Sequence, residues 1–358
     1  MESSLPWSWY FDPEILRLEQ DAIFRRSWQY VGHLGQVAEA ESFFAGRAGD
    51  VPVVVTRAAD GELRAFLNVC RHRGSVIVEG EGKRASLQCP YHAWTYGLDG
   101  SLRAAPRSDE TAPREELGLV PLRVAEWGPF VFVNPEADGP SLEETVGELW
   151  SALPVDGLAF HHRVEYALES NWKVACENYL ECYHCAVAHP GFSAVIDVSE
   201  DEYLLERHQW HMSQYAHVKA AAYSPGEPPG SPETPSTGPL TRTGDSVAGE
   251  FHFVWPNLKV NVYPGRPNLS IGPVWPEGPE RSLGFLDYFF APDEDESWIR
   301  DLLELDDQVG REDTALVERV QRGVRTGVLT EGRLLGESEQ LIAHFDDLVR
   351  EALAQRAS

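Results

Sequence analysis

The chain has 358 residues, 42% of them hydrophobic, and is long enough for two packed domains. No apolar run approaches the roughly 20 residues that a membrane span needs, and 57 acidic against 30 basic residues leave a formal net charge of −27, which would repel nucleic acid. Residues 1–14 lack a charged segment followed by an apolar one. We therefore expect a cytoplasmic protein with neither a membrane nor a nucleic-acid partner.

The first predicted element is an amphipathic helix over residues 13–30, where apolar side chains recur at helical spacing after Asp12. Residues 31–135 then break into short strand-like runs bounded by Gly, Asp and Pro, such as VPVVVTR and FVFVNP. We expect a small all-β domain over residues 41–140. The preceding residues 1–40 should carry an N-terminal helix that packs on a larger second domain.

The second predicted domain, residues 141–358, mixes strands and helices. A helical pattern runs from Trp172 to about His189, and strand-like segments between residues 251 and 290 predict an antiparallel sheet. Two amphipathic patterns, over residues 294–322 and 336–354, predict helices that flank the sheet. Residues 223–245 are rich in Pro and Gly and predict a mobile loop, either a passive insertion or a lid over an active-site mouth. The expected fold class is α+β.

Two short segments in the first domain each contain one Cys and one His. They read CRH from residue 70 and CPYH from residue 89. Two thiolates and two imidazoles suit a 2Fe-2S cluster with sulfur on one iron and nitrogen on the other. Such a set can also hold structural zinc, although zinc sites seldom take one ligand of each kind from each arm. The candidate cluster ligands are Cys70, His72, Cys89 and His92.

The other three cysteines crowd into the helical pattern of the second domain. They are Cys176, Cys182 and Cys185. A redox CxxC pair normally opens a helix after a strand, whereas Cys182 and Cys185 lie inside a longer helical pattern, so we do not expect a dithiol role.

The same segment contains a candidate metal site. Glu177, Glu181 and His184 fall at i, i+4 and i+7, on one face of a helix. His189 follows His184 by five residues, which exceeds one helical turn, so the helix must bulge or end before His189. Pro190 is consistent with an end. A pair of histidines at this spacing is a weak signal by itself.

The strings around these residues resemble a known family. CRHRG and CPYHAWTY resemble the two loops of Rieske domains, with Ala93 where that family more often has Gly. NWKVACENYLECYHCAVAHP resembles the mononuclear-iron motif of Rieske non-haem iron oxygenases, so the resemblance covers nearly the whole chain in the same order. It implies a Rieske 2Fe-2S domain over residues 41–140 and a catalytic domain over residues 141–358.

The resemblance implies a mononuclear Fe(II) held by two His and one Asp, with open positions for O2. His184 and His189 match the two histidines. Asp313 best matches the carboxylate, because a Glu follows five residues later on a predicted helix; Asp306 and Asp307 are the alternatives.

The resemblance also implies how electrons arrive. Glu181 stands where the family has an acid, usually Asp, that links His92 of one subunit to an iron-ligating His of the next, which implies a homotrimer. Asn178 would lie near the iron. The chain has no GxGxxG fingerprint, so electrons from NAD(P)H must come through a separate flavin or iron–sulfur reductase or a ferredoxin.

Two reaction classes compete for the small-molecule substrate. Glu181, the string ECYHC, which is typical of betaine oxygenases, and the acidic composition favour hydroxylation beside the nitrogen of a quaternary or tertiary amine, with oxidative demethylation. The alternative is ring hydroxylation or O-demethylation of an aromatic compound. A Rieske protein that only transfers electrons would leave the second metal site without a role.

Overall fold

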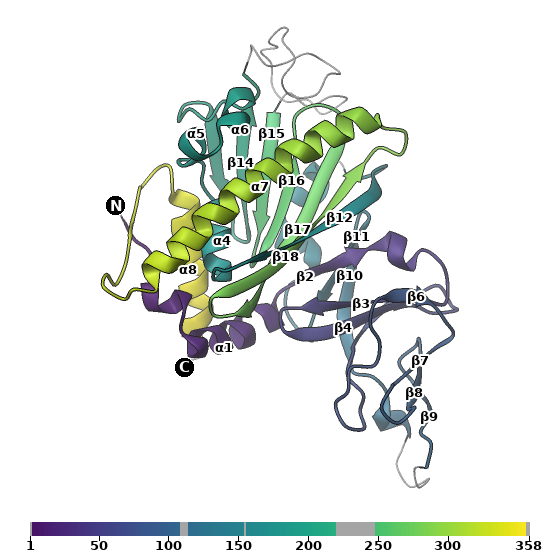
Figure 1. Ribbon diagram of the computed structural model, residues 1–358. Coiled ribbons are helices and arrows are strands. Elements are labelled where there is room, and N and C mark those ends of the chain that lie inside the picture. Colours follow the sequence, from purple (N-terminus) through teal and green to yellow (C-terminus); the bar gives the residue numbers. More distant parts are fainter. Residues whose placement is uncertain (1, 108–113, 154, 220–247, 356–358) are drawn as a thin grey trace. The chain divides into compact units, whose positions relative to one another are not determined.

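The computed structural model describes residues 2–107, 114–153, 155–219 and 248–355, and they form two compact units (Figure 1). The smaller unit consists of Ile23–Thr145 and Trp150–Asp156. The larger unit consists of Met1–Ala22, Val146–Leu149 and Gly157–Ser358, as far as these segments are described. The predicted loop at residues 223–245 lies outside the described residues.

The smaller unit is built from antiparallel strands. One sheet has seven strands in the order β2-β11-β10-β5-β4-β3-β6, and a second has three in the order β7-β8-β9. The run VPVVVTR forms β4, as its β-branched residues predict. The elements are η2 (Phe24–Arg26), β2 (Gln29–His33), η3 (Leu34–Val37), β3 (Ser42–Ala48), β4 (Val51–Arg57), β5 (Leu63–Leu67), β6 (Glu81–Lys83), β7 (Ser86–Gln88), β8 (Thr95–Gly97), β9 (Leu102–Ala104), η4 (Arg114–Leu117), β10 (Pro121–Trp127) and β11 (Phe130–Asn134), followed by α2 (Leu142–Val146) and α3 (Leu149–Ala152).

The larger unit contains a seven-stranded antiparallel sheet in the order β12-β18-β17-β16-β15-β14-β13 and a short pair, β1-β19. Its strands are β1 (Glu2–Ser3), β12 (Ala159–Leu168), β13 (Tyr203–Arg207), β14 (His211–His217), β15 (Ala248–Val254), β16 (Leu258–Val262), β17 (Asn268–Gly278), β18 (Arg281–Phe290) and β19 (Arg333–Leu334). Its helices are η1 (Trp7–Tyr10), α1 (Pro13–Ala22), α4 (Trp172–Tyr179), α5 (Cys185–Ala188), α6 (Pro190–Val195), α7 (Glu296–Val324) and α8 (Gln340–Ala354).

The long helix α7 crosses one face of this sheet (Figure 1). Asp295 caps its start by accepting from Ser297 N at 2.8 Å. Beyond the cap, Trp298, Ile299 and Leu302 are buried in one hydrophobic cluster with aromatic side chains of the sheet. This apolar stripe fixes which side of α7 faces the sheet and therefore where its polar residues point. The expected α+β class is confirmed.

Two predicted helices are too long. The first ends at Ala22, and residues Gln29–His33 form β2, which pairs with β11 and is buried throughout. The units accordingly divide the chain near residue 23, whereas the sequence suggested residue 40. The second helix, predicted from Trp172 to about His189, ends at Tyr179, and a short separate helix, α5, follows from Cys185. No helix in the described parts of the chain is long and apolar enough to cross a membrane.

Candidate functional site

Each candidate cluster loop is a tight turn closed by the carbonyl of its cysteine. Cys70 O accepts from Gly74 N at 3.0 Å, and Cys89 O accepts from Ala93 N at 3.1 Å. The φ angle is 71° at Gly74 and 58° at Ala93. Glycine adopts this left-handed conformation freely, whereas alanine pays a steric cost of about 1 kcal/mol. The alanine therefore keeps the backbone that the turn needs, at a small cost.

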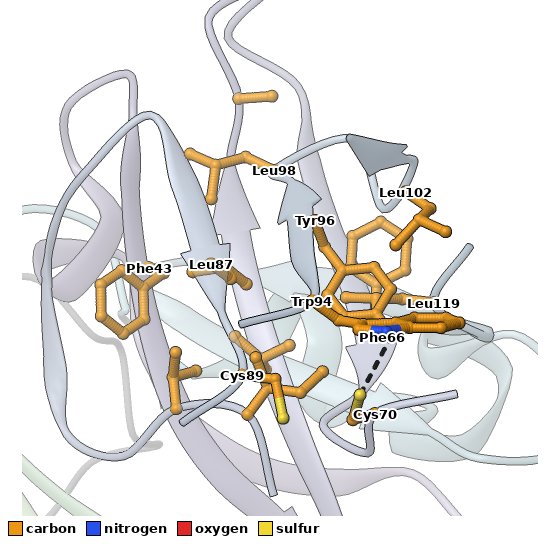
Figure 2. Close-up of a cluster of buried hydrophobic side chains, with 14 residues drawn as sticks. Phe43, Phe66, Cys70, Leu87, Cys89, Trp94, Tyr96, Leu98, Leu102 and Leu119 are labelled. Carbon is orange, nitrogen blue, oxygen red and sulfur yellow. Dashed lines mark hydrogen bonds between the residues drawn. The ribbon is translucent and has the colours of Figure 1, made fainter. Parts of the chain in front are cut away.

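The two thiols are buried and the two imidazoles are exposed. Cys70 and Cys89 are 3% and 2% exposed, and Figure 2 shows both at one end of a buried cluster, beside Trp94. The exposed rings of His72 and His92 lie 4.6 Å apart between centroids, and His72 stacks on Trp94. This division fits a 2Fe-2S cluster whose sulfur-bound iron is buried and whose nitrogen-bound iron lies near solvent.

The sulfur atoms of both cysteines have hydrogen-bond partners. The hydroxyl of Tyr96 lies 3.3 Å from Cys70 Sγ, as the dashed line in Figure 2 marks. Burial opposes ionisation of the Cys89 thiol, but the backbone N–H groups of Tyr91 and His92 point at its sulfur, and the pKa of Cys89 is lowered. A lowered pKa favours the thiolate form of Cys89, which is the form that binds a metal.

The second candidate centre lies in the larger unit. It is formed by α4, by residues 180–190, which follow α4 directly, and by α7. Helix α4 is held to α1 by two contacts with Glu19. Trp172 Nε1 donates to Glu19 Oε2 at 2.8 Å, and the ammonium of Lys173 pairs with the same carboxylate. The side chains of Glu19 and Lys173 are fully buried. Asn171 caps the helix by accepting from Lys173 N at 3.0 Å.

Glu181 leaves the helix and folds back on the turn that follows it. Its carboxylate accepts from the backbone N–H of Tyr183 and, at 3.2 Å, from that of His184. Glu177 stays on α4 and turns elsewhere, accepting from Tyr10 Oη at 2.7 Å. The predicted single helical face with Glu177, Glu181 and His184 is therefore wrong. The predicted break before His189 is confirmed, because α5 ends at Ala188 and α6 begins at Pro190.

Three donor atoms converge at this turn. His184 Nε2 lies 3.1 Å from His189 Nε2 and 3.4 Å from Asp313 Oδ1, and His189 Nε2 lies 3.0 Å from Asp313 Oδ1. Ligands bound to one metal at about 2.1 Å and at right angles lie about 3.0 Å apart. The three atoms could therefore be ligands of one metal ion, since their separations match those expected for neighbouring ligands.

The other ring nitrogen of each histidine meets a glutamate. His184 Nδ1 contacts Glu181 Oε1, and His189 Nδ1 lies 2.8 Å from Glu312 Oε2. A carboxylate at Nδ1 keeps the proton there, so Nε2 presents its lone pair to the metal position. The sequence analysis did not single out Glu312, although a carboxylate is the usual outer partner of a ligating histidine.

The charges of the site suit a cation. Burial disfavours protonation of His184, but Asp313 and Glu181 raise its pKa to about 9. Burial likewise opposes the charge on Asp313, yet the two imidazoles hold the pKa of Asp313 well below its usual range. Metal binding would displace the proton of His184, and the site would then offer one anionic and two neutral donors, as Fe(II) in a two-His, one-carboxylate site requires.

The other candidate residues have different surroundings. Asp306 is buried and accepts hydrogen bonds from the hydroxyls of Tyr263 and Tyr288, while Asp307 is exposed and pairs with Arg311. Asn178 Nδ2 lies 3.3 Å from His184 Nε2 and 3.0 Å from Asp313 Oδ1, at the edge of the donor face.

Cys182 and Cys185 form a disulfide beside this site. The sequence led us to expect no paired dithiol, because both residues were placed inside one helix. The helix ends at Tyr179, and the turn brings the two sulfur atoms together.

Two cavities of the larger unit meet at the donor face. The first, of about 130 Å³, contains His184, His189 and Asp313 in its wall. The second, of about 370 Å³, lies between β12, β18 and α7. Asn178, Lys259 and Asp313 lie in the walls of both cavities. The two cavities therefore share a wall that includes one of the three donor residues.

Comparison with known proteins identifies the family of both parts of the chain. Residues 27–123 match the Rieske [2Fe-2S] domain, and residues 155–355 match the ring hydroxylating alpha subunit (catalytic domain). The chloroplastic choline monooxygenase of Amaranthus tricolor is 34% identical over 95% of this chain and 75% of its own length. The carnitine monooxygenase oxygenase subunit of Acinetobacter pittii is 34% identical over 97% of this chain and 94% of its own.

A solved quaternary ammonium Rieske monooxygenase, connected with carnitine oxidation by gut microbiota and with inter-subunit electron transfer, has the same fold. It superposes with a TM-score of 0.84 at 32% identity, covering 98% of this chain and 95% of the other. The two sites and this fold define an oxidoreductase with a Rieske cluster and a mononuclear iron. The chain belongs to the Rieske non-haem iron oxygenases, as an alpha (catalytic) subunit.

Proposed function

We propose that this oxygenase hydroxylates a carbon beside the nitrogen of a quaternary ammonium compound. The reaction consumes the substrate, O2, two electrons and two protons, and it yields the hydroxylated substrate and water. The C–N bond at the hydroxylated carbon then breaks and gives an aldehyde and an amine: attack on an N-methyl group yields formaldehyde and the demethylated amine, and attack on the neighbouring methylene yields a longer aldehyde and trimethylamine. The relatives that act on choline and carnitine, each matched over nearly the whole chain, support this substrate class.

The observation that carries the proposal is the three-donor face. His184, His189 and Asp313 are assigned as the ligands of the mononuclear iron, because their donor atoms lie 3.0 to 3.4 Å apart. The cluster ligands are assigned as Cys70, His72, Cys89 and His92. When bound, the iron supplies a site for O2 activation and the cluster supplies electrons.

The chain's own residues prepare this chemistry. Glu181 and Glu312 orient the two imidazoles through Nδ1, and the amide of Asn178 holds Asp313 Oδ1 at 3.0 Å. Glu181 is also proposed to contact His92 of a neighbouring subunit and so connect the two centres across a homotrimer. Inter-subunit electron transfer in the solved relative supports this arrangement.

The first cavity offers aromatic faces to a cation. Phe251 lies in its wall, with ring centroids 5.8 Å from Phe192 and 5.7 Å from Tyr263. A quaternary ammonium group cannot donate hydrogen bonds, so aromatic faces are its characteristic partners.

Electrons are proposed to come from NAD(P)H through a separate reductase or ferredoxin, and the cytoplasmic location stays a prediction.

The test is a substrate screen with product detection. Purified enzyme loaded with both metals is mixed with a broad-specificity reductase, NADH and O2, and trimethylammonium compounds are compared with aromatic acids. We expect a trimethylammonium compound to give an aldehyde and the amine released by C–N cleavage, either demethylated amine or trimethylamine, in step with NADH oxidation. Product from aromatic acids alone would overturn the proposal. Asp313→Ala serves as the control that retains the cluster but lacks an iron ligand.

A further inference from the structure

The wall shared by the two cavities contains a lysine without a carboxylate partner. Lys259 lies on β16, a central strand that is paired on both sides, and is only partly exposed. The chain has only three other lysines, and each has an anionic or carbonyl partner: Lys83 pairs with Glu39, Lys173 pairs with Glu19, and Lys219 donates to Ser193 O. Among the described residues, no ion pair within 4.0 Å includes Lys259.

The immediate neighbours of Lys259 are aromatic rings. Its ammonium lies 4.9 Å from the ring centroid of Tyr166 and 5.7 Å from that of Tyr179. Burial disfavours the charged form, but Tyr166, Cys176 and Asp313 together raise the pKa of Lys259, so it is protonated at neutral pH. The shared wall therefore presents a cation beside two aromatic rings, without an ion pair within 4.0 Å to any described carboxylate.

The other charged groups on the cavity walls are already engaged. Glu181 contacts His184, Asp306 accepts from two tyrosines, and Asp307 pairs with Arg311. Glu165, on the second cavity, is exposed to solvent. A charge held at a partly buried site without a counterion is costly, which makes the position of Lys259 a site for an anionic group from outside the chain.

A cationic substrate makes this requirement sharper. If the enzyme takes a quaternary ammonium compound, a bare lysine in the cavity wall repels it, and a simple amino alcohol such as choline offers no compensation. A zwitterion with a carboxylate at its other end pairs with the lysine and leaves its trimethylammonium group to the aromatic faces. Lys259 and the aromatic side chains Phe251 and Tyr263 line the same first cavity, so one molecule there faces both kinds of partner.

We infer that Lys259 is a specificity residue that binds the carboxylate of a zwitterionic, betaine-type substrate, so the enzyme prefers a carboxylated quaternary amine to choline. This inference rests on the proposed function. It assigns the cation end to the first cavity, beside the donor face, and the carboxylate end to the wall shared with the second cavity.

The experiment measures binding directly, by anaerobic calorimetry on enzyme loaded with both metals, with γ-butyrobetaine and choline as probes. The variants are Lys259→Gln, Lys259→Met, Lys259→Arg and, as a matched control, the exposed Lys83→Gln. Lys259→Gln and Lys259→Met should weaken γ-butyrobetaine binding about 30-fold, equivalent to about 2 kcal/mol, because a desolvated ion pair is lost. Choline binding should be unchanged or tighter, and Lys259→Arg should keep part of the preference.

The outcomes separate the inference from the proposed function. Equal weakening of both probes, no weakening of either, or tighter binding of choline by the unaltered enzyme overturns the role of Lys259 while the amine oxygenase stands. Loss of mononuclear iron in both neutral variants also overturns it, since Lys259 would then support Asp313 rather than substrate. If neither amine binds or turns over but an aromatic acid does, the proposed function itself fails.

Discussion

Glu312→Gln tests whether the outer carboxylate tunes the iron site. Glu312 Oε2 lies 2.8 Å from His189 Nδ1, and its other oxygen accepts from Gln308 Nε2 at 3.0 Å. Glutamine keeps the length and one acceptor oxygen but removes the negative charge that makes the imidazole a stronger donor. Loss of such an outer partner costs about 10- to 100-fold in metal affinity, or about 1.4 to 2.8 kcal/mol.

The assay is an anaerobic Fe(II) titration of iron-depleted protein against a chromogenic chelator. The visible absorption of the Rieske cluster serves as an internal control and should not change. Glu304→Gln is the matched control, because Glu304 lies exposed on the same helix, α7. An Fe(II) affinity of Glu312→Gln equal to that of Glu304→Gln would refute the reasoning, since Glu312 would then be a surface acid that merely touches the histidine.

Three further predictions concern Asp313, Glu181 and Asp346. Asp313→Ala should abolish product formation and lower iron occupancy while the cluster spectrum stays intact. Asp307→Ala, which alters an exposed ion pair, should retain product formation and iron occupancy. If iron analysis shows the opposite, Asp307 rather than Asp313 is the iron ligand. The Glu181→Gln variant should bind both metals, but its cluster should be reoxidised about 10- to 100-fold more slowly on stopped-flow mixing with substrate and O2. A reoxidation rate equal to that of wild type would contradict the proposed role of Glu181 in connecting the two centres. Burial raises the pKa of Asp346 to about 7, above its ordinary value of about 3.9. The folded state therefore holds the extra proton and loses stability as pH rises from about 4 to 7. In denaturant unfolding, the free energy of unfolding of Asp346→Asn relative to that of wild type should rise by up to about 1.4 kcal/mol per pH unit across that window. If this difference in free energy does not vary with pH, the raised pKa of Asp346 is contradicted.

Features specified by short stretches of chain could be read from the sequence. The two cluster loops need only a few consecutive residues each, because the Cys and His of one arm lie on the same tight turn. The β-branched run at 51–57 forms a strand, and the apolar stripe of residues 294–322 forms α7 with its start and end shifted by two residues. In each case local propensity and hydrophobic period agree with the tertiary environment.

The sequence misjudged elements where side chains or distant partners decide the backbone. Residues 23–30 continue a helical pattern, yet Gln29 and Tyr30 belong to β2 because β11, a hundred residues later, offers a strand to pair with. The helix after Trp172 stops at Tyr179, and the carboxylate of Glu181 accepts from the backbone of the turn that follows. A periodicity argument cannot weigh such a competing hydrogen bond.

The sequence by itself determined the ligand chemistry of this protein: two Cys–His arms, a pair of histidines and a choice among three aspartates. Only the tertiary structure decides how these residues meet. Asp306, Asp307 and Asp313 share one helix, and the burial of Trp298, Ile299 and Leu302 against the sheet sets the rotation of α7 that turns Asp313 and Glu312 toward His189. Strand β16 places Lys259 in the wall of both cavities, and none of the described carboxylates forms an ion pair with it within 4.0 Å. Helix rotation and strand register depend on contacts across more than a hundred residues, so no local pattern encodes them.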